Sequence, residues 1–341
     1  MATTRISQYL PPNIDPTQAP LAYGSRALPK LNSELNEECD LLTRQRALMA
    51  LCDHLRDPEH IQHAIQCGII LSLKKLLADD DVTVRWKTLE VLYIISCHSV
   101  GRNAYLEEDV IGPIAELFED SSDVVRKFAH QAIEMVAELA IGAQGVVDGN
   151  LVPILVAKLN DETDEIKGSI LDTLHFCLKV NTEDALNSGA MQVFHSLLDH
   201  HDPHIRAKAA RDIMDLSVPL AGKVKAHEVG SMKRLIELMA DEEPEVRANC
   251  AAAIMFIAIT TQGKYQAIEH NAIETLLLNL EDTHSAVRLN AVKALTGLSE
   301  APEGRKRLMN EVDKFEKMRN DSSLAVQTAV DMAIKVITWT P

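Results

Sequence analysis

The sequence predicts an all-α chain made of repeated helical units, and three observations support this. First, an aliphatic anchor, usually preceded by an acid five positions earlier and followed by a base, recurs about every 41 residues, at Val84, Val125, Ile166, Ile205, Val246, Val287 and Val326. Second, apolar residues follow each anchor at helical spacing, as at Leu89, Leu92 and Ile95. Third, aromatic residues make up only 4% of the chain, and no segment is typical of a strand-rich domain.

A period of this length with helical patterning is typical of armadillo/HEAT-type α-solenoids. We therefore expect a right-handed α-solenoid of about seven to eight repeats, forming one continuous domain over 27–341. Three helices in each unit resemble the armadillo repeat, whereas the spacing of acid and base resembles the HEAT repeat. Such a stack has a long surface for partners and no natural pocket for chemistry.

Each unit is expected to contain three helices in order. A short first helix begins at a glycine, as over 101–108, 263–270 and 304–311. A turn follows sixteen positions before the next anchor, where only residues that tolerate a left-handed backbone occur: Gly68, Asp109, Asn150, Gly189, Gly230, Asn271 and Asn310. A second amphipathic helix comes next, as over 70–77, 191–198 and 231–239. The third helix starts in the acidic stretch before the anchor, because acids favour a helix N-terminus.

The acids and bases around the anchors form a candidate structural ladder. The acid lies six residues before the base, so the two can reach each other or the adjacent repeat. Singly exposed, such a pair contributes only about 0–1 kcal/mol, but repeated pairs would fix the geometry between repeats. The ladder residues are Asp79, Arg85, Asp120, Arg126, Asp241, Arg247, Asp282 and Arg288.

The third helices are expected to line a concave groove, which is the candidate partner site. Residues six and ten positions after the anchors should point into it: Ile94, Met135, Phe176, Arg211, Phe256 and Lys293. Apolar side chains there suit an amphipathic helix or an apolar edge of another protein. The alternative is that the positions ten after the anchor are half-buried core. The chain lacks the Trp and Asn ladders with which nuclear-import armadillo proteins hold basic peptides.

Residues 1–26 differ from the rest of the chain. Four prolines among polar residues exclude a continuous helix, which leaves an extended N-terminal arm or a disordered tail. An arm that lies on a partner or on the first repeats would use apolar anchors at Leu10, Ile14, Leu21 and Tyr23.

Charge and cysteine content limit the function classes. A net charge of −16 disfavours non-specific binding to nucleic acid and docking on anionic membranes. The six cysteines form no C-x-x-C motif, which fits a reducing compartment. No apolar signal region and no apolar run of the length of a membrane span is present, so we expect a soluble intracellular protein.

Motifs for chemistry are missing. The sequence has no phosphate-binding glycine loop, no nucleophile elbow and no H-E-x-x-H. His60, His63 and Cys67 could share one helical face, and His200, His201 and His204 lie in a predicted loop, but both groups are better explained as exposed surface than as zinc sites. We therefore expect no enzymatic activity, no cofactor, no metal and no small-molecule substrate.

Several segments of the sequence resemble one protein family. They are LPPNIDPTQAPLAYGSRALPKLN and DLLTRQRALMALCDHLRDPE near the start, HSVGR, ITTQGKYQAIE, LNAVKAL with LSEAPEGRK, and the terminal IKVITWTP. They are similar to the radial spoke head protein family of motile cilia, also called the rhabdoid tumour deletion region protein family. The similarity extends over nearly the whole chain and is weakest from about residue 107 to 235, where only the repeat pattern matches.

This resemblance implies a non-enzymatic armadillo-repeat subunit of the axonemal radial spoke, the complex that links outer doublet microtubules to the central pair. Its partners would be other radial spoke proteins, and it would be found in the cytoplasm, in the cytoskeleton and in the axoneme of the cilium or flagellum. The alternative is a soluble armadillo adaptor that binds a helical or peptide partner in its groove.

Overall fold

The computed structural model describes residues 26–35 and 39–339 and is all-helical over that part of the chain. The predicted arm residues Leu10, Ile14, Leu21 and Tyr23 lie outside the described residues. The chain divides into two compact units at residues 142 and 143. This division falls inside α9 (Ala140–Asp148), and each unit is described by itself.

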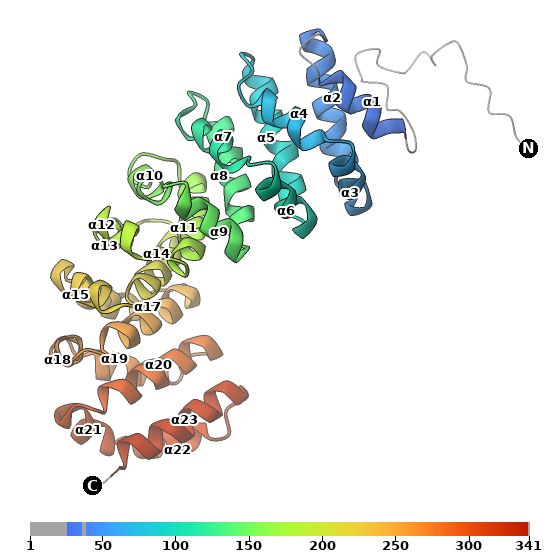
Figure 1. Ribbon diagram of the computed structural model, residues 1–341. Coiled ribbons are helices and arrows are strands. Elements are labelled where there is room, and N and C mark those ends of the chain that lie inside the picture. Colours follow the sequence, from blue (N-terminus) through green and yellow to red (C-terminus); the bar gives the residue numbers. More distant parts are fainter. Residues whose placement is uncertain (1–25, 36–38, 340–341) are drawn as a thin grey trace, which may run out of the picture. The chain divides into compact units, whose positions relative to one another are not determined.

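The first unit begins with a partial repeat and continues with three-helix repeats (Figure 1). Its helices are α1 (Ala27–Glu34), α2 (Leu41–His54), α3 (Pro58–Gln66), α4 (Ile69–Leu76), α5 (Val82–Ser96), α6 (Ser99–Glu107), α7 (Ile111–Ala115), the 3₁₀ helix η2 (Glu116–Glu119) and α8 (Asp123–Ala137).

The second unit repeats the same three-helix pattern. Its helices are α10 (Val152–Lys158), α11 (Asp164–Leu178), α12 (Glu183–Asn187), α13 (Ala190–Leu197), α14 (Pro203–Leu216), α15 (Leu220–Val229), α16 (Ser231–Glu237), the 3₁₀ helix η3 (Leu238–Ala240), α17 (Pro244–Ile257), α18 (Thr261–Glu269), α19 (Ala272–Asn279), α20 (Ser285–Leu298), α21 (Pro302–Met309), α22 (Val312–Met318) and α23 (Leu324–Ile337).

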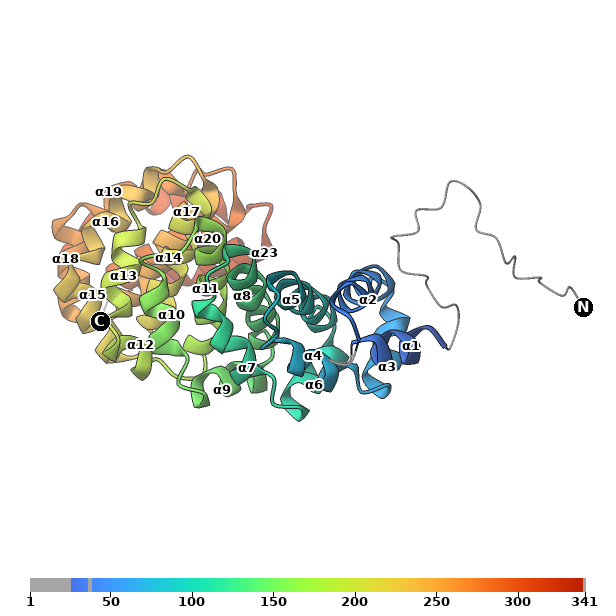
Figure 2. The same cartoon turned by 90° about the horizontal axis from the view of Figure 1, so that it is seen from above.

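The third helices of successive repeats pack directly on one another. In the first unit α2 packs on α5 and α5 on α8; in the second unit α11, α14, α17, α20 and α23 pack in that order. Figure 2 shows α2, α5 and α8 as one layer, with α3, α4, α6 and α7 in the other. We use "third-helix face" for the exposed side of the third-helix layer within each unit.

The anchors form the core beneath these layers. All seven aliphatic anchors from Val84 to Val326 are buried, with at most 2% of their surface exposed. Burying a Val or Ile side chain stabilises a fold by about 1.5–3 kcal/mol. The recurring anchor therefore marks the residue around which each third helix packs on its own repeat and on its neighbours.

The turns before the second helices use a left-handed residue at six of the seven expected positions. Gly68, Asp109, Asn150, Gly189, Gly230 and Asn271 have φ between 50° and 80°. The prediction is wrong for Asn310, whose φ is −76°. There the N–H groups of Asn310 and Glu311 donate to the carbonyls three residues earlier, so the chain turns by continuing a right-handed 3₁₀-type winding.

The first helices begin two residues before the glycines at which they were predicted to begin, as α6 begins at Ser99 and α15 at Leu220. The glycines lie in the first turn instead, where they allow a close approach to the third helix before them. A Cβ on Gly222 would lie 1.7 Å from the carbonyl oxygen of Leu216, and one on Gly101 would lie 2.0 Å from that of Ile95. Only a residue without a side chain fits at this distance, which explains why glycine recurs there.

No single described helix is long and apolar enough to cross a membrane. One bent pair, α9 with α10, passes that test by length and composition only.

Candidate functional site: the third-helix face

The ladder residues join neighbouring repeats through side chains and the same repeat through the backbone. Arg247 shows the pattern: its Nη1 donates to the carbonyl oxygens of Asp241 (2.7 Å) and Glu242 (3.0 Å). Its Nε donates to Oδ2 of Asp282 in the next repeat (2.7 Å). One guanidinium thus fixes the loop that precedes its own helix and ties that helix to the next one.

The same contact between repeats recurs within each unit. The pairs are Arg44 with Asp79 (3.4 Å), Arg85 with Asp120 (2.8 Å), Arg206 with Asp241 (2.8 Å), Arg247 with Asp282 (2.7 Å) and Arg288 with Asp321 (2.7 Å). Arg126 donates to the carbonyl oxygen of Asp120 in its own repeat (3.0 Å). The sequence allowed an ion pair within a repeat or between repeats, and each of these five pairs joins an Arg to the Asp of the next repeat.

Each ladder carboxylate also holds its own loop. Oδ1 of Asp282 accepts the N–H of His284 (2.8 Å), and Oδ1 of Asp321 accepts the N–H of Ser323 (2.8 Å). Burial alone would raise the pKa of Asp282, but the hydrogen bonds from Arg247 and His284 outweigh it and lower the pKa. The hydrogen bond from Arg288 is the main cause of the lowered pKa of Asp321. These carboxylates are therefore stabilised in their charged form.

The ladder changes chemistry between α11 and α14. The position of the base holds Lys167, and the position of the next acid holds His200. His200 turns instead to Asp164, with its Nε2 3.2 Å from Oδ1. This junction therefore lacks the Arg–Asp pair found between α14 and α17.

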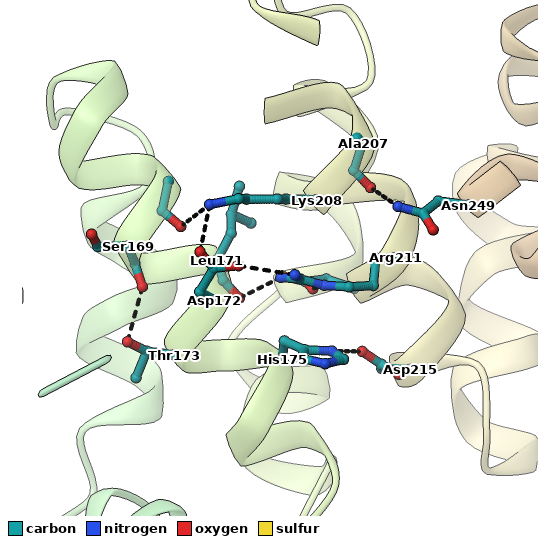
Figure 3. Close-up of polar contacts among 12 residues, drawn as sticks. Ser169, Leu171, Asp172, Thr173, His175, Ala207, Lys208, Arg211, Asp215 and Asn249 are labelled. Carbon is teal, nitrogen blue, oxygen red and sulfur yellow. Dashed lines mark hydrogen bonds and ion pairs between the residues drawn. The ribbon is translucent and has the colours of Figure 1, made fainter. Parts of the chain in front are cut away.

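Charged side chains lie instead at the middle of the α11–α14 junction (Figure 3). Asp172 accepts from Lys208 (2.5 Å) and from Nη1 of Arg211 (2.9 Å). Nε of Arg211 donates to Oδ1 of the buried Asp212 (3.0 Å), and His175 Nδ1 lies 2.5 Å from Oδ2 of Asp215. The cations here are neutralised by carboxylates of the protein itself.

Asp212 is the least accessible member of this group. It is fully buried, and its Oδ2 has no hydrogen-bond partner. Burial raises its pKa well above the usual value, and the nearby Asp215 adds to the effect, although Arg211 opposes it. Burial therefore disfavours the charged form of this carboxyl group in the folded protein.

Farther along the second unit, the third-helix face is open and apolar. A depression of about 730 Å³ lies over α17, α20 and α23; its lining is Met255, Leu289, Lys293, Thr296, Leu324, Ala325, Thr328, Ala329 and Met332. We call it the apolar trough. Leu324 is 75% exposed and Met332 is 59% exposed, so two large apolar side chains face solvent at its border.

The six groove candidates are placed as follows. Lys293 is exposed and lines the apolar trough. Arg211 is held in the α11–α14 network. Phe256 is half-buried next to the trough residue Met255, because one residue along a helix changes the direction of the side chain by about 100°. Ile94, Met135 and Phe176 are half-buried on α5, α8 and α11.

The first unit carries an aromatic cluster on its third helices that the search at fixed positions missed. Trp86 of α5 stacks on Phe128 of α8 with ring centroids 6.1 Å apart, and Tyr93 lies 6.4 Å from the same Phe128 ring. Lys87 lies over the Trp86 ring and pairs with Glu90 (2.7 Å). Trp86 lies two residues after its anchor and Phe128 three residues after its own. The sequence could have indicated the cluster only through these two aromatic residues at nearly equivalent positions of successive repeats.

Two groups of described residues bring three possible metal ligands within 4.8 Å of one another. In the group of Asp164, His200 and His201, Nδ1 of His200 accepts the N–H of Asp202 (3.1 Å). In a neutral ring the hydrogen is therefore on Nε2, the atom nearest Asp164. The other group is His175, Asp212 and Asp215, where the Arg211 guanidinium already holds Asp212.

The histidines of α3 have local contacts. The His60 ring stacks on His54 at 3.8 Å, and its Nδ1 lies 2.8 Å from the carbonyl oxygen of His54. His201 is exposed in the α13–α14 loop, as predicted, whereas His204 is exposed in the first turn of α14, because that helix already begins at Pro203.

Comparison with known proteins identifies the fold. No protein-family model matches the chain. An engineered protein of known crystal structure superimposes with a TM-score of 0.84 at 21% identity, over 93% of this chain and 79% of its own. A designed armadillo repeat protein in complex with peptide (KR)4 superimposes with a TM-score of 0.63 at 24% identity, over 67% of this chain and 99% of its own.

These likenesses agree with the helix order and with the packing of third helix on third helix in each unit. The protein therefore has the fold of an armadillo-type α-solenoid.

Proposed function

We propose that the protein is a non-enzymatic scaffold that binds protein partners on its third-helix face. The observation that carries the proposal is the apolar trough over α17, α20 and α23. Exposed apolar patches of this kind, bordered by polar residues, mark sites of protein interaction. A partner that covered Leu324 and Met332 would remove their apolar surface from water, which favours association.

The fold neighbours support a peptide or helix as the bound element. The designed armadillo repeat protein is in complex with the peptide (KR)4. In this chain α17, α20 and α23 present an apolar depression, which suits the apolar face of a helix. This supports the adaptor function over other uses of the same fold.

Purification of tagged full-length protein from its own cells tests the proposal. We expect at least one protein to co-purify in fixed ratio with the wild type and to be lost with Leu324→Asp. Leu278→Asp is the matched control, because Leu278 is 76% exposed on the second helix α19. Equal recovery of every partner by both variants would contradict the use of the trough, and melting curves establish that both variants fold.

We further propose that the scaffold belongs to the radial spoke of motile cilia. The support is the sequence resemblance, which covers both ends of the chain, from LPPNIDPTQAP to IKVITWTP. In this role the protein would join other spoke proteins through its solenoid surfaces and through the segment 1–26. It would act without nucleic acid, membrane or small-molecule substrate.

Location of a tagged copy in a multiciliated cell tests this second proposal. Axonemal signal that persists after detergent and salt extraction is the expected result. Diffuse signal that detergent removes would contradict it and would leave the soluble adaptor. Deletion of residues 1–26 distinguishes the two further, because a spoke subunit should lose assembly whereas an adaptor that uses only the groove should keep its partner.

A further inference from the structure

The lining of the apolar trough has an unusual charge for this protein. The chain has 50 acidic and 34 basic residues, yet the nine lining residues include no carboxylate and one cation, Lys293. Lys293 is exposed and has no ion pair or hydrogen bond with another described residue. The lining of the trough is thus apolar with one positive charge, whereas the chain as a whole carries a net negative charge.

Repeat equivalence explains why Lys293 stays unpaired. Six residues after the anchors, the second unit carries Asp172, Arg211, Ala252, Lys293 and Met332 on successive third helices. Arg211 pairs with the equivalent residue of the preceding helix, Asp172. The equivalents on either side of Lys293 are Ala252 and Met332, neither of which can accept its hydrogen bonds. The anion that would complete this row is therefore absent from the described protein.

The shape of the trough favours a helix as its occupant. Leu324 and Met332 lie eight residues apart on α23, which is about 12 Å or two turns along its axis. Between them, Ala325 and Ala329 are four residues apart and lie on one side of the helix. Small side chains between two large ones let the backbone of a second helix approach closely.

We propose that the apolar trough binds an amphipathic helix of a partner protein whose apolar face carries one carboxylate that pairs with Lys293. This inference rests on the proposed function and names the chemistry of the partner. The apolar residues of that helix would cover Leu324 and Met332, and its carboxylate would occupy the position that Asp172 fills for Arg211. A basic peptide such as (KR)4 would place cation against cation and is excluded on this account.

Two designed helical peptides test the proposal with the full-length protein. Each has about 16 residues and leucines at positions i, i+4 and i+7, and they differ only in carrying Glu or Lys at i+3. We expect fluorescence anisotropy to show the Glu peptide binding about tenfold more tightly than the Lys peptide. Lys293→Glu should reverse this order, and Lys293→Met should abolish the difference.

A third variant separates the two levels of the proposal. Leu324→Asp should weaken the Glu peptide at least tenfold, whereas Leu278→Asp should leave its affinity unchanged. If both peptides bind equally to the wild type but lose affinity with Leu324→Asp, the acidic partner is wrong and the docking face stands. If neither peptide binds, or Leu324→Asp has no effect, the helix-binding trough is wrong. Circular dichroism melting shows whether each variant remains folded.

Discussion

The α11–α14 junction and the α20–α23 junction join the same kind of helices with charges in different places. Between α20 and α23, the ion pair lies near the helix N-termini, where Nε and Nη2 of Arg288 donate to Asp321 at 2.7 and 2.8 Å. Between α11 and α14, the ladder positions hold Lys167 and His200, and the ion pairs lie at the middle of the helices.

The comparison shows how the location of an ion pair decides what the surface can bind. Where the pair lies at the end of the helices, the middle of the face stays open, and this is where the apolar trough is found. Where the charges occupy the middle, they neutralise one another and leave little for a partner. The ladder therefore has a functional consequence besides stability, because it places the ion pairs between these repeats at the helix ends, outside the trough.

The largest expected effect concerns the charged network. Arg211→Ala should lower the free energy of unfolding by about 3–5 kcal/mol, since it removes the guanidinium that binds both the buried Asp212 and Asp172 of the preceding repeat. Urea unfolding followed by circular dichroism measures the change. Arg211→Lys is the control: it keeps the charge but loses the forked geometry, and it should cost less. A change below about 1 kcal/mol for the alanine variant would show that the network is not what stabilises this junction.

The turns provide the next contrast. Gly189, in the loop before α13, has φ of +78°, so Gly189→Val should destabilise by roughly 1–3 kcal/mol. No side chain or backbone atom would clash with the new Cβ, so the cost is conformational. Asn310→Val at the equivalent turn of the α20–α23 region should cost less, because its φ of −76° suits any residue. Equal melting temperatures for the two variants would contradict this account of the turns.

The ladder can be weakened one half at a time. Arg247→Gln should cost about 1.5–2 kcal/mol, because it removes the charged bond to Asp282. The backbone bond can remain, since Gln327, the equivalent residue of the last repeat, donates to the carbonyl oxygen of Asp321 (2.7 Å). The folded pKa of Asp282 is depressed, so its stabilisation is present above its ordinary value of 3.8 and is lost as pH falls through the lower folded pKa. The loss of unfolding free energy caused by Arg247→Gln, measured by urea unfolding, should therefore become smaller at low pH.

Asp212 should respond to pH in the opposite direction. Its folded pKa is raised, so its contribution to stability is largest below 3.8 and falls as pH increases toward the folded pKa. Asp212→Asn removes this dependence. The free energy of unfolding of the variant, relative to that of the wild type, should therefore rise by at most about 1.4 kcal/mol for each unit by which the pH is raised. Parallel urea curves between pH 4 and pH 8 measure the difference. A constant difference across this range would show that Asp212 stays ionised.

The fold could be predicted because its signals are local and repeated. The anchors, the left-handed turns and the acidic loops each follow from the chemistry of single residues, and their period revealed the unit. The exception at Asn310 arose because an Asn permits a left-handed backbone without requiring one.

The surface was less predictable, because it depends on which side chains neighbouring repeats bring together. Lys293 was selected as a groove residue, but the sequence does not show that its flanking equivalents leave it unpaired while Arg211 finds Asp172. Likewise, Phe256 was chosen and Met255 lines the trough, because a shift of one residue turns the side chain away. The fully buried Asp212 gave no signal at all, since its neighbours come from two repeats.

The double role of each ladder arginine also has a consequence for protein engineering. Arg247 binds its own loop and the aspartate 35 residues later, so an excised or duplicated module remains compatible with its neighbours when the cut preserves this spacing. A cassette that runs from the end of one third helix to the end of the next would carry both its ladder aspartate, which pairs with the arginine of the preceding repeat, and its ladder arginine, which pairs with the aspartate of the following repeat. Duplicating the cassette that runs from the end of α14 to the end of α17 should yield a longer protein in which α17, α20 and α23 still line an unchanged trough.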